Sequence, residues 1–112
     1  MVRKSERKLI PRVISRAGTS QGYSYESLSF RKQNKKMEPF LLSVTEKVAE
    51  ENTYSHDGEE FLFVMKGTAE LLLEEERITL EEEDCVYFDS SLRHRLLSKD
   101  GREVTVLAVV TR

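Results

Sequence analysis

The sequence is poor in cysteine, tryptophan and proline, and it has no long hydrophobic run. A single cysteine, Cys85, can neither close an intramolecular disulfide nor build a cysteine-rich zinc site, so the stability of the fold must come from its core. This thiol content suits a reducing compartment, and we expect a cytoplasmic protein. No apolar stretch approaches the roughly 18 residues of a membrane span, and Pro11 interrupts the short apolar stretch after the basic N-terminus, so we expect neither a membrane segment nor a secretory signal.

The length indicates how many domains the chain contains, and the charge distribution indicates how it is divided. A chain of 112 residues with 34% charged residues predicts one soluble domain. Residues 1–40 hold ten Lys or Arg against three Asp or Glu, although the whole chain has a net charge of -2. We therefore predict a basic N-terminal segment over residues 1–22 and a folded domain over residues 23–112. The basic segment has no interleaved aromatic residues and is too short for a helix-turn-helix, so we expect no direct nucleic-acid binding by this chain.

From Tyr23 onward, apolar residues recur at every second position, which predicts β-strands with one buried face. The alternating sets are Tyr23 and Tyr25; Leu28 and Phe30; Phe40, Leu42 and Val44; Phe61, Phe63 and Met65; Ala69, Leu71 and Leu73; Ile78 and Leu80; Val86 and Phe88; and Val104, Val106, Ala108 and Val110. Turn-forming residues separate them at 58, 66–67, 81–84, 89–91 and 99–101. The pattern predicts an all-β domain with at least seven strands. Residues 46–52 fit a solvated loop, and the acidic runs 74–76 and 81–83 bracket a short strand at a sheet edge.

The two histidines, His56 and His94, are both expected where a strand meets a turn. Two imidazoles and one carboxylate on neighbouring strands can form the facial triad of non-haem iron, and related sets hold zinc, nickel or manganese. Tyr54 shares the parity of His56, so its phenol would lie beside a ligand or hydrogen-bond a bound anion. The alternative is that both histidines are ordinary residues at the rim of the domain.

The order of these residues is more informative than their types. The pattern His56-x3-Glu60-x6-Gly67, followed by Asp84-x4-Asp89 and His94, resembles the two motifs of the cupin superfamily. The resemblance runs from about residue 23 to residue 111, and it is strongest to the cupin sensor domains of helix-turn-helix (XRE-type) transcriptional regulators. It implies a single-domain jelly-roll (RmlC-like) β-barrel with a metal near its mouth.

Carried over residue by residue, the resemblance implies that His56, Glu60 and His94 are the metal ligands. Tyr54 occupies the position of the family's usual first histidine, so the implied set has two histidines and one carboxylate, with water or Tyr54 completing the shell. Glu59 is an alternative to Glu60 if Asp57 and Gly58 form a two-residue hairpin, although the family spacing selects Glu60.

Strand parity adds candidates for a ligand pocket. Leu62 shares the face of Glu60, and either Tyr87 or Phe88 must point inward, so we predict a pocket with Tyr54, Leu62 and Tyr87 in its wall. The large aromatic residues are first of all core material. The set is Phe40, Phe61, Phe63, Tyr87 and Phe88.

Three further side chains receive a structural interpretation. Arg93 and Arg95 flank His94, and we expect both at the surface. The alternative is that Arg95 lies near the barrel mouth and binds a carboxylate ligand. Cys85 reads as a buried small apolar residue rather than a nucleophile.

Three functions fit these features. The first is a small-molecule-binding sensor or regulatory module that uses a divalent metal ion (Zn, Fe, Ni or Mn). The second is a small metal-dependent enzyme, a dioxygenase, isomerase or lyase. The third is a metal-free interaction domain. We expect a homodimer in each case, because a barrel of this size exposes sheet edges.

Overall fold

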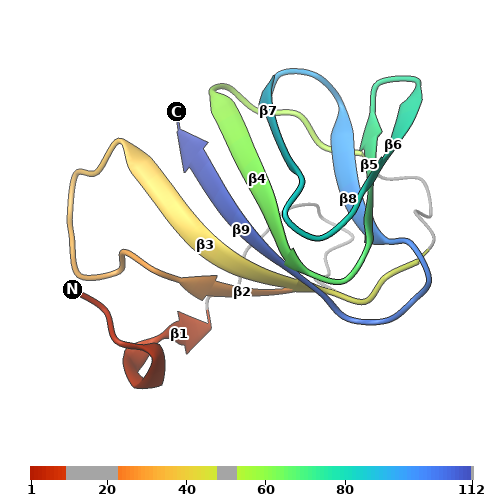
Figure 1. The fold of residues 1–112 in the computed structure, drawn as a ribbon. Coiled ribbons are helices and arrows are strands. Elements are labelled where there is room, and N and C mark those ends of the chain that lie inside the picture. Colours follow the sequence, from red (N-terminus) through yellow and green to blue (C-terminus); the bar gives the residue numbers. More distant parts are fainter. Residues whose placement is uncertain (10–22, 48–52, 112) are drawn as a thin grey trace.

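A computed structural model describes residues 1–9, 23–47 and 53–111 of the chain. In these residues a short 3-10 helix, η1, precedes nine strands (Figure 1). The elements are η1 (Lys4–Glu6), β1 (Lys8–Leu9), β2 (Tyr23–Ser27), β3 (Met37–Val44), β4 (Glu59–Lys66), β5 (Ala69–Leu73), β6 (Glu76–Leu80), β7 (Cys85–Asp89), β8 (His94–Ser98) and β9 (Val104–Thr111). The prediction of an all-β domain with at least seven strands is confirmed.

The strands form two antiparallel sheets that enclose a common core. The larger sheet has the order β1-β2-β3-β9-β4-β7, and the smaller has the order β6-β5-β8. In Figure 1 the central strands β3, β9 and β4 lie side by side, with β5, β6 and β8 beyond them. The acidic edge strand predicted between residues 74 and 83 is β6, which lies at the edge of the smaller sheet. The architecture is a jelly-roll β-barrel.

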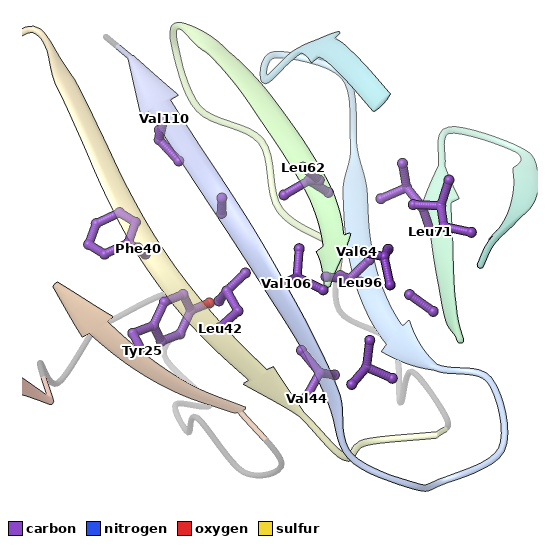
Figure 2. Packing of buried hydrophobic residues seen from close by; sticks show 14 of the residues in the cluster. Tyr25, Phe40, Leu42, Val44, Leu62, Val64, Leu71, Leu96, Val106 and Val110 are labelled. Atoms are coloured by element: carbon purple, nitrogen blue, oxygen red, sulfur yellow. The ribbon is translucent and has the colours of Figure 1, made fainter. Parts of the chain in front are cut away.

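The core follows directly from the alternation in the sequence. Along β9 the residues alternate strictly between buried and partly buried, because one face of each strand points into the barrel. Figure 2 shows the side chains of Leu42, Val106 and Leu62 from the larger sheet with Leu71 and Leu96 from the smaller one. Apolar residues from both sheets therefore pack into one cluster, whose burial provides the main stabilising free energy of the fold.

Two parts of the predicted strand pattern are wrong. Phe61, Phe63 and Met65 do not form the buried face of β4, because Glu60, Leu62 and Val64 point inward and the aromatic residues point outward. Both faces of this strand are rich in apolar residues, so a period of two cannot identify the inner one. The alternation at Leu28 and Phe30 also forms no strand, since β2 ends at Ser27.

The turn between β4 and β5 depends on Gly67. Its φ is +90°, and a Cβ placed there would lie 3.0 Å from the carbonyl oxygen of Glu103. Gly101 has a similar φ of +85°, but a Cβ placed there would make only an ordinary van der Waals contact, 3.8 Å from the Lys47 side chain. Only glycine adopts both the conformation and the close approach at position 67 without strain.

Part of the basic N-terminal segment joins the larger sheet. Lys8 and Leu9 form β1 and pair with Ser27 and Glu26 of β2, while residues 10–22 lie outside the described residues. The boundary predicted at residue 22 stays a prediction. Within the described residues, no helix has the length and apolar character needed to cross a membrane.

Candidate metal centre

Three side chains converge at one end of the barrel: His56, Glu60 and His94, called the His-Glu-His triad below. His56 lies in the segment before β4, Glu60 is the second residue of β4, and His94 begins β8 in the other sheet. One ligand atom from each lies within 4.8 Å of the others. The Nε2 atoms of His56 and His94 are 2.9 and 3.0 Å from Oε1 of Glu60. The structure therefore brings together the three residues that the sequence singled out.

Backbone hydrogen bonds hold the His56 segment against the two sheets. Tyr54 and His94 exchange two of them, each 2.9 Å long, so Tyr54 pairs with the first residue of β8 as an added bridge. The amide of His56 donates to the carbonyl of Ser90, and the amide of Ser90 donates to the carbonyl of Gly58. The backbone of His56 is thus held in place by main-chain hydrogen bonds although it lies outside a regular strand.

Glu60 is a buried carboxylate, with 8% of its surface exposed. Burial alone raises its pKa, but hydrogen bonding and charge from His94, together with those from His56, lower the pKa further than burial raises it. The Ser90 hydroxyl lies 3.4 Å from the same oxygen and can donate to it. The carboxylate is therefore held in its charged form, the form that binds a cation.

The hydrogen bonds of the imidazoles test whether this donor set fits a metal. Nδ1 of His94 lies 2.7 Å from the carbonyl oxygen of Leu92, and Nδ1 of His56 lies 3.2 Å from that of Asp57. A carbonyl oxygen only accepts, so each Nδ1 carries a proton. If both imidazoles are neutral, the lone pairs of both Nε2 atoms face the negative Glu60 carboxylate and are repelled by it. A proton on each Nε2, or a cation shared by the three groups, removes this repulsion. A fixed Nδ1–H with Nε2 facing the site is also the usual arrangement of metal-ligating histidines, so the residues fit a divalent metal.

Phe88 supports His94 from within the barrel. Its ring centroid lies 5.0 Å from that of His94 in an edge-on arrangement, and Phe88 stands opposite Glu60 in the sheet. The sequence left open whether Tyr87 or Phe88 points inward, and the structure selects Phe88.

A cavity of about 220 Å³ opens beside the triad. Its polar wall consists of the triad with Tyr54, Ser55 and Arg95. The remainder of the wall is largely hydrocarbon and comes from both sheets: Tyr25, Leu42, Leu62, Leu71, Leu96, Ala108 and Val110. Tyr54 and Leu62, two of the three residues predicted for the wall of a ligand pocket, both line this cavity.

Tyr87 does not line this cavity, and its placement in the pocket wall is wrong. It is 66% exposed on the outer face of β7, where its hydroxyl donates to the carboxylate of Glu59. The physical reason is the register of β7, in which Tyr87 pairs with the outward-facing Phe61. The same contact places Glu59 outside the barrel, so Glu59 does not replace Glu60.

Arg95 was expected on the surface, and this expectation is wrong. It is 6% exposed because the chain before β4 covers it: its guanidinium donates to the Tyr54 hydroxyl at 2.7 Å and to the carboxylate of Glu46. Its carbon Cζ lies 5.3 Å from the centre of the Tyr54 ring, a cation–π distance. Arg93, in contrast, is exposed as predicted and pairs with Glu74 and Glu75.

Sequence reasoning missed Glu46 and Ser90, and it misplaced Cys85. Glu46 falls in the segment that was read as a solvated loop, of which residues 48–52 lie outside the described residues. Ser90 looked like a simple turn residue, and nothing in the sequence signals its contact with Glu60. Cys85 is exposed on β7 rather than buried.

The comparisons with known proteins concern the fold of the chain. A family model described as a cupin domain matches residues 42–110. No curated protein matches the sequence at a significant level.

Several solved structures share the fold. Hydroxypropylphosphonic acid epoxidase from S. wedmorenis is 19% identical with a TM-score of 0.77, over 100% of this chain and 59% of that one. A structure of Fe(II) HppE gives 19% identity and a TM-score of 0.79, over 98% and 59%. A transcriptional regulator of the HTH_3 family from Vibrio cholerae is 13% identical with a TM-score of 0.68, over 81% and 51%. The chain spans only about half to three-fifths of each, and at these identities the likeness shows a common fold.

Proposed function

The chain belongs to the cupin domain family, and on this premise we propose that it binds a small molecule in its barrel beside a divalent metal ion held by the His-Glu-His triad. The observation that carries the proposal is the convergence of three ligand atoms on one wall of the cavity. A divalent ion bound there would supply Lewis acidity and open positions for a ligand. Zinc, iron, nickel and manganese all accept such a donor set.

Each residue has a distinct part in this proposal. His94, held by Leu92, and His56, held by Asp57, would present Nε2 to the ion, and Glu60 would supply the negative charge. The apolar wall would exclude water and hold the body of the ligand. In our proposal the module is a sensor, in which occupancy of the barrel is reported to a partner. The likeness to a transcriptional regulator supports this role at the level of the fold alone.

The test is ligand-dependent stabilisation of the full chain, with and without metal. Thermal unfolding is followed for zinc-loaded and metal-free protein in the presence of a panel of small organic molecules. The proposal expects compounds that stabilise the loaded protein and that lose this effect in His94→Ala. Equal shifts in loaded and metal-free protein would show binding that does not depend on the triad, and would overturn it.

The second candidate is a small metal-dependent enzyme, a dioxygenase, isomerase or lyase. The observation that favours it is a two-histidine, one-carboxylate set open to a cavity, since this set leaves positions free for substrates. Tyr54 lines the cavity and offers an acid–base group, whereas Glu59 lies outside it. Oxygen consumption by iron-loaded protein that is abolished in Glu60→Gln would favour a dioxygenase over the sensor.

We also propose that two copies of the chain pair through the outer face of the larger sheet. Two adjacent rows of apolar side chains cross β3, β9, β4 and β7 there, and we call them the outer apolar patch. The rows are Pro39, Val109, Phe61 and Tyr87, and Leu41, Leu107, Phe63 and Cys85. None of the eight is buried, and none carries a charge, so a second copy of the same patch can cover it without opposing like charges. We also propose a cytoplasmic location, because a chain with a single cysteine suits a reducing compartment.

A further inference from the structure

We propose that Arg95 and Tyr54 form the anion-binding end of the cavity, and that the ligand is a small carboxylate with an apolar body. This inference rests on the proposed metal-dependent binding function and names the class of molecule that the barrel takes.

The first step is that a buried cation lies in the cavity wall. Arg95 follows His94 directly in β8, lines the cavity and is 6% exposed. Tyr54 pairs with His94 through the backbone and lies with its ring centroid 6.4 Å from that of His94. The guanidinium, the phenol and the triad therefore lie at the same end of the cavity.

The hydrogen bond between Arg95 and Tyr54 has a defined direction. The guanidinium donates to the oxygen of Tyr54, so the proton of the phenol cannot point toward Arg95. Tyr54 is thus oriented by Arg95 as a donor on its other side. An anionic group at this end would accept from the phenol while the guanidinium stabilises its charge. A planar guanidinium fork suits carboxylates in particular.

The third step is the balance of charge. Glu46 pairs with Arg95, and the carboxylate of Glu60 offsets one of the two charges of a divalent ion on the triad, so one positive charge remains at this end of the cavity. Ligating imidazoles are neutral. A monoanion matches this charge, whereas a cationic ligand would be repelled.

The last step is the shape and polarity of the remaining wall. The volume of about 220 Å³ lies below the roughly 300–1,000 Å³ of pockets for drug-sized ligands, so the molecule is small. Leu42, Leu62, Leu71, Leu96 and Val110 offer hydrocarbon and no hydrogen bonds. A sugar or polyol needs polar partners around its whole surface, whereas a short or branched aliphatic carboxylate needs them at one end only.

The test measures the binding of three acids and their neutral amides to the zinc-loaded full chain by calorimetry: acetate, butanoate and 3-methylbutanoate. Each amide has nearly the shape of its acid but no charge. We expect at least one carboxylate to bind about tenfold or more tightly than its amide. Arg95→Gln should reduce this preference to within about threefold, while Arg93→Gln, which alters the neighbouring exposed arginine, should leave it unchanged.

A second variant keeps the inference testable if Arg95→Gln fails to fold. Tyr54→Phe removes only the hydroxyl, and it should weaken carboxylate binding several-fold and amide binding less, because the hydrogen bond to a charged acceptor is the stronger one. The inference is overturned if no acid binds more tightly than its amide, because the cavity then has no anion site. It is also overturned if the preference survives in both Arg95→Gln and Tyr54→Phe, since the metal alone would then select the anion.

Zinc content, measured on the same samples, separates this inference from the proposed function. Zinc retained without a preference for carboxylates overturns the anion site and leaves the metal centre standing. A chain that retains no zinc overturns the proposed function, and the charge balance of the anion site fails with it.

Discussion

Nε2 of His94 lies 3.0 Å from Oε1 of Glu60, so an imidazole from the smaller sheet meets a carboxylate from the larger sheet across the end of the barrel. The two side chains are 8% and 10% exposed, and this contact is therefore shielded from water. It connects the two sheets and aims both ligand atoms at one point. The candidate metal centre is thus formed where the two sheets meet, so a metal ion bound there would contact side chains from both sheets.

The first prediction separates the two adjacent glutamates of β4. Glu60→Gln removes the charged ligand and should lower the affinity for Zn²⁺ by about 100-fold or more. Glu59→Gln is the matched control, because Glu59 points outward to Tyr87, and it should change the affinity by less than about threefold. Competition with a chromophoric chelator measures both. Equal losses in the two variants would mean that the metal is bound elsewhere.

The second prediction concerns stability. A ligand that binds only the folded state stabilises it by mass action, by about 4 kcal/mol at a free concentration 1,000 times its Kd. Saturating Zn²⁺ should therefore raise the Tm of the protein by more than about 10 °C. Differential scanning calorimetry with and without chelator checks this result.

The control for that shift is His94→Ala, whose Tm should be nearly independent of Zn²⁺. A zinc-dependent Tm in this variant would indicate binding to surface carboxylates instead of the triad.

The third prediction separates two costs of replacing a glycine: the strain of a positive φ, and the clash of a new Cβ with a nearby backbone atom. Gly67→Ala and Gly101→Ala both place a side chain at positive φ, but only the first brings a Cβ to 3.0 Å from the Glu103 carbonyl. We expect each variant to lose about 1–3 kcal/mol of unfolding free energy through strain, with a further loss of about 1 kcal/mol or more at position 67. Urea denaturation measures the difference. Equal losses would contradict the tight packing of this turn.

The fourth prediction tests the outer apolar patch. Phe63→Lys places a charge at its centre, opposite Cys85, and should convert a dimer to a monomer. Phe63→Leu keeps the surface apolar and should remain dimeric. Light scattering coupled to size-exclusion chromatography gives the mass of each variant.

Cys85 provides an independent readout of the same interface. Its thiol is exposed in the single chain, so it should react with a thiol reagent much more slowly in the dimer than in Phe63→Lys. A wild-type chain that is monomeric at micromolar concentration would rule the dimer out.

Much of the fold could be predicted from the sequence because the signal is local. The strict alternation from Val104 to Val110 is a period of two that only a strand with one buried face produces. The resemblance to the cupin motifs likewise implied that His56, Glu60 and His94 lie together. It did not show that His56 precedes β4 and that His94 belongs to the other sheet, which only the closure of the barrel brings beside Glu60.

The remaining features depend on contacts that no local pattern reports. The burial of Arg95 comes from Tyr54 and Glu46, which are about 40 to 50 residues away in the chain. Tyr87 and Phe88 are both large aromatics, so their sequence cannot say which one faces the core. Only the pairing of Glu60 with Phe88 across the sheet decides it.

Elemental analysis by mass spectrometry tests the central claim most directly. Tag-free protein is incubated with iron(II), nickel or zinc, desalted and assayed beside His94→Ala. The account predicts about one metal ion per chain in the wild type and almost none in the variant. A wild-type chain that retains no metal under any of these conditions, or a variant that retains as much as the wild type, would contradict it.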